Sequence, residues 1–254
     1  MVVRLGISAL VLIAASAALR LRVPRGVPLW ASLGAGALIF GLNFSLLYIG
    51  ELTVPSGTAA VLWGVFPILT AFGAAALLQG AEPLTVRGLG GAALAATGLV
   101  VVFWAQLGTA SLTGLLAILG GIVCAAAGAL VVKRFAHDVH PVLFNALGNA
   151  TGAAGIGLVL VLSGRRAVLP PTPEAWGALL YLVVVGSLLA FTAWAWLLKR
   201  WPATRLSFQT VLSPLIAVVL GALVLEEDVG LAFLAGTALV LAGTWVAARP
   251  RAAA

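Results

Sequence analysis

Charge is what this sequence has least of. Only 8% of its 254 residues are Asp, Glu, Lys or Arg, against about a quarter in soluble domains, while 63% are hydrophobic. The mean hydropathy is correspondingly high, at +1.18. A chain of this composition has too few polar side chains to cover a water-exposed surface, so a soluble globular domain is excluded. The sequence is that of an integral membrane protein.

Residues that carry out chemistry are scarce as well. The single cysteine, Cys124, lies inside an apolar run and has no second cysteine to pair with in the chain. The apolar runs hold no paired carboxylates, no Ser/His/Asp set and no Cys/His cluster, and the sequence has no glycine-rich phosphate loop with its lysine. We therefore expect a protein that is not an enzyme and has no cofactor.

The two histidines stand close together, at positions 137 and 140, with Asp138 between them. This compact group invites a metal interpretation, but two histidines in a solvated loop without further ligands rarely form a site. We expect no metal here.

What the sequence has in abundance is long apolar runs. Runs of about 15 to 25 residues match the length at which a helix, rising 1.5 Å per residue, crosses a hydrocarbon core about 30 Å thick. The run Leu112 to Val132 is apolar on every face, which favours helices over barrel strands. We predict an all-α integral membrane fold of about nine transmembrane helices. The segments are 5–19, 27–50, 54–78, 88–105, 112–132, 141–162, 175–198, 203–225 and 229–248.

The first segment resembles a signal peptide because Arg4 precedes an apolar run. Three arginines, at positions 20, 22 and 25, follow it where small residues should mark a cleavage site. We therefore predict a retained membrane helix.

The basic residues are unevenly divided between the loops. When loops alternate across nine spans, eleven Lys and Arg fall on one side and three on the other. The positive-inside rule makes the first side cytoplasmic, with the C-terminus inside and the N-terminus outside, in a cytoplasmic (inner) membrane. Orientation in the lipid bilayer thus explains the net charge of +7, and we expect no nucleic-acid partner. The eleven are Arg20, Arg22, Arg25, Arg87, Lys133, Arg134, Lys199, Arg200, Arg205, Arg249 and Arg251; the three are Arg4, Arg165 and Arg166.

Two stretches of the chain resemble each other. Pro55 and Pro67 are 12 residues apart, as are Pro202 and Pro214, and each pair brackets the start of a long apolar segment. Equivalent segments are five apart along the chain, an odd number, so they cross the membrane in opposite directions. This pattern predicts an inverted-topology repeat, whose halves can rock about a central site and expose it to either side.

The likeness continues after the prolines. Each copy has an acidic turn and then a glycine-rich helix, whose two glycines are seven residues apart. We assign the first repeat to residues 1–107, with four segments, and the second to 108–254, with five, so that one helix is missing from the first copy. The matching residues are Glu82, Gly91 and Gly98 in the first copy, and Glu226 or Glu227, Gly236 and Gly243 in the second.

The stretches PSGTAAVLWGVFPILTAFGAAALLQGAEPLTVRGLGGAALAATGLVVV and PATRLSFQTVLSPLIAVVLGALVLEEDVGLAFLAGTALVLAGTWVA resemble the EamA-like branch of the drug/metabolite transporter superfamily. The resemblance covers nearly the whole chain and implies ten helices in two five-helix inverted repeats. Arg4 in RLGISALVLIA is similar to the arginine that often opens the family's second helix. We therefore expect the chain to begin one helix late, through a misplaced start codon or a true loss.

Neutral side chains are left to line any pathway, because we expect no charged residue near the middle of a span. Asn145 and Asn149 share a helix face, where they either bind a polar substrate or bridge to a neighbouring helix. Trp63 lies well inside its span, where it either packs or stacks on a substrate. The candidate pathway residues are Asn43, Tyr48, Trp63, Asn145, Asn149, Thr192, Trp194, Gln209 and Ser213.

A second group of residues is expected to shape the helices. Gly148 and Gly152 form a GxxxG motif, and small residues of this kind let helix backbones approach closely. Pro67 and Pro214 interrupt helical hydrogen bonding and act as hinges or as fixed kinks. The predicted hinge or packing residues are Pro67, Pro214, Gly91, Gly148, Gly152 and Gly236.

These features predict a secondary transporter that moves a small-molecule substrate by alternating access. The resemblance implies export or exchange of metabolites, amino acids, amines or drugs. Two alternatives stay open, a non-transporting membrane subunit and an intramembrane enzyme acting on lipids. A homodimer is left open as a further partner.

Overall fold

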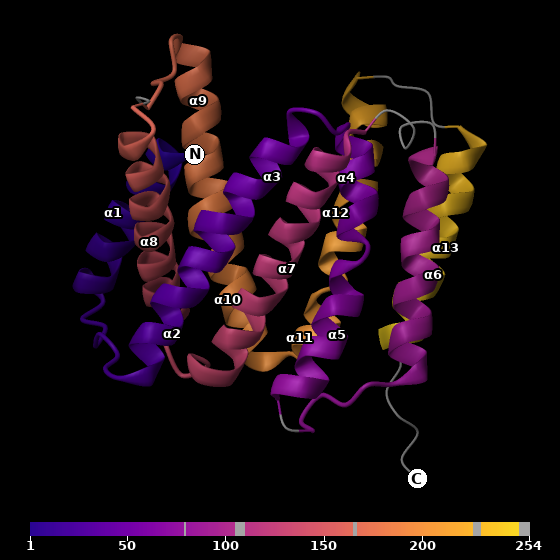
Figure 1. Cartoon of the computed structure of the whole chain (residues 1–254), viewed down its shortest axis with the longest axis horizontal. Coiled ribbons are helices and arrows are strands. Elements are labelled where there is room, and N and C mark those ends of the chain that lie inside the picture. Colours follow the sequence, from indigo (N-terminus) through magenta and orange to yellow (C-terminus); the bar gives the residue numbers. More distant parts are fainter. Residues whose placement is uncertain (79, 105–109, 165–166, 226–229, 249–254) are drawn as a thin grey trace. The chain divides into compact units, whose positions relative to one another are not determined.

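The computed structural model describes residues 1–254 except 79, 105–109, 165–166, 226–229 and 249–254, and over this part the chain folds into helices without strands (Figure 1). Helix occurs in every predicted segment. The elements are α1 (Val2–Ala18), α2 (Val27–Gly36), the π-helix η1 (Ala37–Leu42), α3 (Asn43–Glu51), α4 (Ser56–Trp63), α5 (Phe66–Leu77), α6 (Val86–Val102), α7 (Leu112–Phe135), α8 (Pro141–Leu162), α9 (Pro173–Tyr181), the π-helix η3 (Leu182–Ala190), α10 (Phe191–Arg200), α11 (Ala203–Leu206), α12 (Gln209–Leu225) and α13 (Leu231–Ala248).

Five helical stretches are long and apolar enough to cross a membrane. Three shorter apolar helices accompany them, and the structure thus confirms an all-helical fold of the multi-pass membrane type. The number of nine spans stays a prediction. The acidic turn predicted at 226–228 lies outside the described residues, as do Arg165, Arg166, Arg249 and Arg251. The five long stretches are Val27–Glu51, Ser56–Leu77, Leu112–Phe135, Pro141–Leu162 and Pro173–Arg200.

Polar side chains mark the starts of several helices. Thr85 Oγ1 accepts a hydrogen bond from Gly88 N at 3.0 Å ahead of α6, and Thr172 Oγ1 accepts one from Ala175 N at 3.3 Å ahead of α9. His140 Nδ1 accepts from Val142 N at 3.3 Å ahead of α8. Such caps satisfy backbone donors that have no partner in the first helical turn, so these loop residues fix where the helices begin.

The chain divides into two compact units, each built from two stretches of sequence. Unit 1 consists of residues 1–45 and 127–201, and unit 2 of residues 46–126 and 202–254. Each unit takes a part of both predicted repeats. A division by spatial contact does not test a boundary defined by internal likeness, so the repeat boundaries stay a prediction.

Unit 1 is held together by close contacts of α1, α2 and η1 with α8. The glycines of the predicted GxxxG motif lie in this contact: a Cβ at Gly148 would lie 2.6 Å from the Phe40 ring, and one at Gly152 would lie 2.7 Å from Phe40 Cβ. Gly36 faces the Gly148 backbone directly. The absence of side chains at these positions lets the phenylalanine pack against the backbone of α8.

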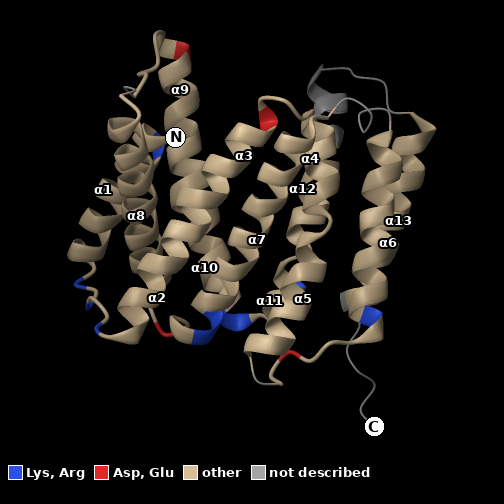
Figure 2. Ribbon diagram, in the orientation of Figure 1, with Lys and Arg blue, Asp and Glu red and all other residues tan. Residues whose placement is uncertain are grey.

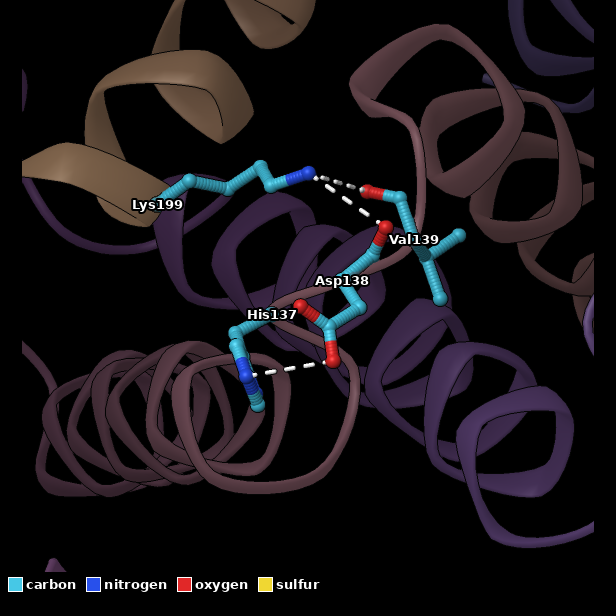
Figure 3. A network of polar contacts seen from close by, with 4 residues as sticks. All are labelled: His137, Asp138, Val139 and Lys199. Carbon is cyan, nitrogen blue, oxygen red and sulfur yellow. Dashed lines mark hydrogen bonds and ion pairs between the residues drawn. The ribbon is translucent and has the colours of Figure 1, made fainter.

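Cations cap helix ends at one end of unit 1. Lys133 Nζ donates to Leu198 O at 2.7 Å and to Trp201 O at 2.8 Å. Lys199 Nζ donates to the carbonyls of Asp138, at 3.4 Å, and Val139, at 3.3 Å, beside the His137–Asp138 ion pair of 3.2 Å (Figure 3). Within this unit, Lys and Arg gather where α1, α7 and α10 end (Figure 2). This grouping agrees with the assignment of these loops to one side of the membrane.

In unit 2, α6 and α13 pack through glycines. A Cβ at Gly91 would lie 2.5 Å from Gly243 O, and one at Gly98 would lie 2.6 Å from Gly236 O. The order of contacts is reversed along the two helices, so the helices run antiparallel. Gly91 is equivalent to Gly236 but contacts Gly243, and Gly98 is equivalent to Gly243 but contacts Gly236.

The paired prolines of unit 2 lie close to breaks between helices. Pro67 is in the first turn of α5, after the turn at residues 64–65 that ends α4. Pro214 lies inside α12, which begins after a turn at residues 207–208. Helices α4 and α5 run in the direction opposite to α11 and α12, so α4 and α11 begin at opposite ends of this unit (Figure 1).

Candidate functional site

Unit 2 contains a cavity of about 610 Å³ between α4 and α12. Three of the predicted residues, Trp63, Ser213 and Pro214, lie on its wall. Its volume falls within the range of small-molecule sites, which are mostly apolar with a few polar groups. We refer to it as the large cavity. It is lined by Glu51, Ser56, Gly57, Ala59, Ala60, Trp63, Phe103, Thr210, Ser213 and Pro214.

The prolines affect the backbone of this wall. Proline has no N–H, so Pro67 cannot donate to the carbonyl of Trp63, nor Pro214 to that of Thr210, each four residues earlier. Trp63 and Thr210 occupy equivalent positions in the two predicted copies, and both line the large cavity. The two breaks therefore place backbone acceptors without their usual helical partner beside the same cavity.

Side-chain groups in the large cavity are mainly acceptors and aromatic rings. Ser213 Oγ donates to Gln209 O at 2.9 Å and Thr210 Oγ1 donates to Ser207 O at 2.8 Å, which leaves the oxygen lone pairs of both hydroxyls available. Trp63 is half-buried and its ring centroid lies 5.5 Å from that of Phe66. The exposed carboxylate of Glu51 is a further acceptor.

A second, smaller cavity of about 370 Å³ lies in the same unit, at the start of α11. Its wall includes Pro67, Pro202, Thr204 and Arg205. The large cavity has Pro214 and the start of α4 in its wall, so each cavity combines the second proline of one copy with the helix start of the other. Those helix starts lie at opposite ends of unit 2 (Figure 1), and from the residues in their walls we infer that the two cavities lie toward opposite ends as well.

A buried acid holds the helix start beside the smaller cavity. Glu82 is 8% exposed, and its carboxylate accepts hydrogen bonds from Ala203 N at 2.8 Å, Thr204 N at 3.0 Å and Thr204 Oγ1 at 2.9 Å. The acidic turn of the first predicted copy is therefore a cap for the first helix turn of the second copy. A carboxylate is favourable at this position because the N–H groups there lack helical partners.

Unit 1 carries a buried amide network. Asn145 and Asn149 are both completely buried. Asn145 Nδ2 donates to Ser187 O at 2.7 Å and to Thr192 Oγ1 at 3.0 Å, while Asn149 Nδ2 donates to Asn145 Oδ1 at 2.6 Å. The shared face predicted from their spacing is present, and it faces η3 and α10 rather than lipid.

Next to these amides is a group of aromatic rings from η1, α3 and α10. Phe191 lies 4.8 Å from Phe40, 5.9 Å from Phe44 and 6.4 Å from Trp194, measured between ring centroids. The Arg4 guanidinium carbon lies 5.7 Å from the Phe44 ring centroid, and Arg4 Nε donates to Ser187 Oγ at 3.0 Å. Ser187 therefore joins the cation to the amide network, through its hydroxyl on one side and its carbonyl on the other.

The position of Arg4 in the structure contradicts the expectation that it lies in a loop. We placed Arg4 in a loop and expected no charge near the middle of a span, but α1 begins at Val2 and so includes Arg4. Ser187, its hydrogen-bond partner, is about midway along the stretch Pro173–Arg200. The side chain thus contacts the middle of a predicted span.

The sequence model of the EamA-like transporter family matches residues 112–249, more than half of the chain. The chain belongs to the EamA-like transporter family. It is also similar to an uncharacterized transporter of Archaeoglobus fulgidus, with 25% identity over 84% of this chain and 76% of that protein. Protein PecM of Dickeya dadantii is 24% identical over 84% of this chain and 71% of its own length.

A protein of known crystal structure shares the fold. It superposes with a TM-score of 0.81 over 97% of this chain and 85% of its own, at 23% identity. At this level of identity the likeness concerns the fold alone. Together with the family membership, it establishes a transporter-type membrane fold for this chain.

Three further predicted residues of this EamA-like protein are not among the residues that line the large cavity. Tyr48 is 59% exposed and Gln209 is also exposed, and neither lines the cavity. Asn43 is buried: its Nδ2 donates to Ile39 O at 3.4 Å, and its Oδ1 has no partner among the described residues. The pathway roles of these three residues stay predictions.

The contacts of three residues, Ser187, Glu82 and Arg4, were missed by reasoning from sequence. Ser187 looked like an ordinary small residue in an apolar run, and Glu82 was predicted only as part of a turn. A signal for Glu82 was present, since an acid recurs nine residues before the first glycine of the glycine-rich helix in both predicted copies. For Arg4 the signal was its place within the first helical turn of an apolar segment.

Proposed function

We propose that this EamA-like protein is a secondary transporter that moves small metabolites by alternating access, without hydrolysing ATP itself. The observation that carries the proposal is the pair of cavities at opposite ends of unit 2. Each is walled by the second proline of one copy and the helix start of the other, and their volumes are about 610 and 370 Å³. In an inverted-repeat transporter that is more open to one side of the membrane, we expect two cavities with equivalent walls but unequal volumes.

The glycine contacts of α6 and α13 support the inverted repeat behind this proposal. If residues 91 and 236 are equivalent, and 98 and 243 are equivalent, a twofold axis in the membrane plane requires reciprocal contacts. The contacts of Gly91 with Gly243 and of Gly98 with Gly236 have this form. When the two repeats rock about such an axis, the cavity at one end becomes smaller and the cavity at the other end becomes larger.

The substrate class we propose is a small metabolite such as an amino acid or an amine, exported or exchanged across a cytoplasmic membrane. A volume near 610 Å³ accommodates a molecule of that size with some water. The acceptors and the Trp63 ring in the large cavity suit a substrate with donor groups or an apolar side chain.

Trp63→Ala is expected to lower saturable uptake at least tenfold in proteoliposomes, because it removes the largest side chain of the cavity wall. The measurement is uptake of a labelled amino-acid and amine panel, alongside an unfolding temperature in detergent. Trp30→Ala is the matched control, since Trp30 is 72% exposed and lies outside the cavity lining.

Uptake by the wild type that persists in Trp30→Ala and is lost in Trp63→Ala supports transport through the large cavity. Equal uptake by both variants contradicts that route. If a broad panel shows no flux with the wild type, transport is refuted for this chain and a non-transporting subunit becomes the better account.

A further inference from the structure

Arg4 lies far along unit 1 from the end at which α1 ends and α8 begins. Along α1 it lies about 21 Å from Ala18, at 1.5 Å per residue. A Cβ at Gly152 of α8 would lie 3.2 Å from Leu5, and one at Gly157 would lie 3.8 Å from Val2. Those glycines are about 17 and 24 Å along α8 from Pro141. Both helices therefore place Arg4 about 20 Å from the end of unit 1 at which α1 ends and α8 begins, a distance smaller than the thickness of a hydrocarbon core of about 30 Å.

The charge of Arg4 has no counter-ion among the described residues. Among the residues that the structure describes, no carboxylate lies within 4.0 Å of it, and its only hydrogen-bond acceptor is the hydroxyl of Ser187, which Nε uses. A cation at the centre of a bilayer costs about 2.5 to 3.5 kcal/mol on insertion scales and is usually paired or functional. The two terminal nitrogens of the guanidinium are left with their donors unused in this part of the chain.

The surroundings of Arg4 suit a ligand better than a permanent partner. Among the described residues the Arg4 side chain is only partly buried. On one side is the Phe44 ring, which continues into the aromatic group around Phe191. Gly186 packs against the guanidinium, because a Cβ there would lie 2.8 Å from an Arg4 terminal nitrogen, so the missing side chain makes room for Arg4 itself. The π-helix η3 supplies this glycine and Ser187, and π-helical turns are frequent at functional sites.

A purely structural account leaves much of this arrangement unexplained. The hydrogen bond to Ser187 uses one of the five donors of the guanidinium, and a neutral side chain would make that bond without the cost of burying a charge. Lysine or arginine residues that merely anchor a helix lie at the interface, as do the cations at the ends of α1, α7 and α10 (Figure 2). Arg4 is set apart from these by its depth.

We propose that Arg4 binds the carboxylate of the transported molecule through its two terminal nitrogens, with the neighbouring aromatic rings contacting an apolar body attached to that carboxylate. A planar guanidinium and a carboxylate form two parallel hydrogen bonds, which combine strength with orientation. The inference rests on the proposed transport function and narrows its substrates to organic anions and zwitterions with a carboxylate; simple amines are not bound at this site.

The test compares ligands that differ only in the carboxylate. Phenylalanine is paired with phenylalaninamide, and phenylacetate with phenylacetamide. Binding is measured through the ligand-dependent rise in unfolding temperature of the purified full chain in detergent, and flux through counterflow in proteoliposomes. The variants are Arg4→Gln, Arg4→Lys and Ser187→Ala, with Arg22→Gln as the control because Arg22 is an exposed loop cation.

The wild type and Arg22→Gln are expected to prefer each carboxylate over its amide. Arg4→Gln should weaken carboxylate binding at least tenfold and leave amide binding unchanged, and Arg4→Lys should retain part of the preference as a point charge. Ser187→Ala should lower the unfolding temperature slightly and keep the preference, because the charge remains.

Three results overturn the proposal: no carboxylate binds the wild type, Arg4→Gln keeps the preference, or carboxylate and amide weaken together. If Arg4→Gln does not fold, Arg4→Lys and the wild-type ligand pairs still decide the matter. The experiment distinguishes failure of the proposed transport function from failure of the proposed carboxylate site. Carboxylate binding without flux refutes transport and leaves the site in place, whereas flux of amines that ignores Arg4 refutes the site and leaves transport in place.

Discussion

Gly98→Leu is expected to prevent stable folding, with little or no monodisperse protein recovered in detergent. A Cβ at this position would lie 2.6 Å from Gly236 O and 2.8 Å from Val240 N, distances that real Cβ atoms do not adopt. Both obstacles are backbone atoms of α13, which cannot rotate away as a side chain does. Overpacking costs about 1–3 kcal/mol even where neighbours can move, so separation of α6 from α13 should cost more.

Gly90→Leu is the matched control for this substitution. It makes the same change on the same helix, eight residues earlier, where the residue is exposed and nothing lies within 4 Å of the added Cβ. Both variants gain the same helix propensity, so a difference between them isolates the contact with α13. Recovery and unfolding temperature of Gly98→Leu equal to those of Gly90→Leu would mean that the two helices do not pack as described.

The glycines of this contact illustrate which parts of the fold could be predicted from the sequence. Gly98 and Gly243 were identified as equivalents because proline, acid and glycine recur at matched spacing, and spacing is a property of the chain itself. Helix positions followed from the length of apolar runs, since a 30 Å core requires about 20 residues of helix. Neither inference needs knowledge of which residues meet in space.

The direction in which each helix faces was harder to predict. Helices such as α7 and α13 are apolar on all sides, so periodicity does not separate the buried face from the lipid-facing one. Tyr48 and Gln209 were chosen for their chemistry and lie exposed, while Asn145 and Asn149 were chosen in the same way and lie buried. The π-helical turns of η1 and η3 add to the difficulty, because they change which side chains share a face.

Glu82→Ala is expected to lower the free energy of unfolding by about 3 kcal/mol or more, since hydrogen bonds to a charged group contribute about 1.5–3 kcal/mol each. The substitution removes a nearly buried carboxylate and leaves the N–H groups of Ala203 and Thr204 without their acceptor. Glu82→Gln keeps one oxygen acceptor and turns an N–H₂ group toward the other donors, so its loss should be intermediate. Thr204→Val removes only the hydroxyl bond and should cost about 1 kcal/mol.

Glu51→Ala serves as the stability control for the loss of an acid, because Glu51 is exposed and no hydrogen bond from it to a helix start is present in the part of the chain that the structure describes. Its unfolding in detergent should match that of the wild type. The expected order of stability is Glu51→Ala, Thr204→Val, Glu82→Gln and Glu82→Ala, from highest to lowest. Since Glu82 also lines the smaller cavity, its loss frees the start of α11 at one of the two ends that open in the proposed transport cycle. Uptake should therefore fall in Glu82→Ala even at temperatures where the protein stays folded. A Glu82→Ala variant as stable and as active as the wild type would show that the cap contributes to neither.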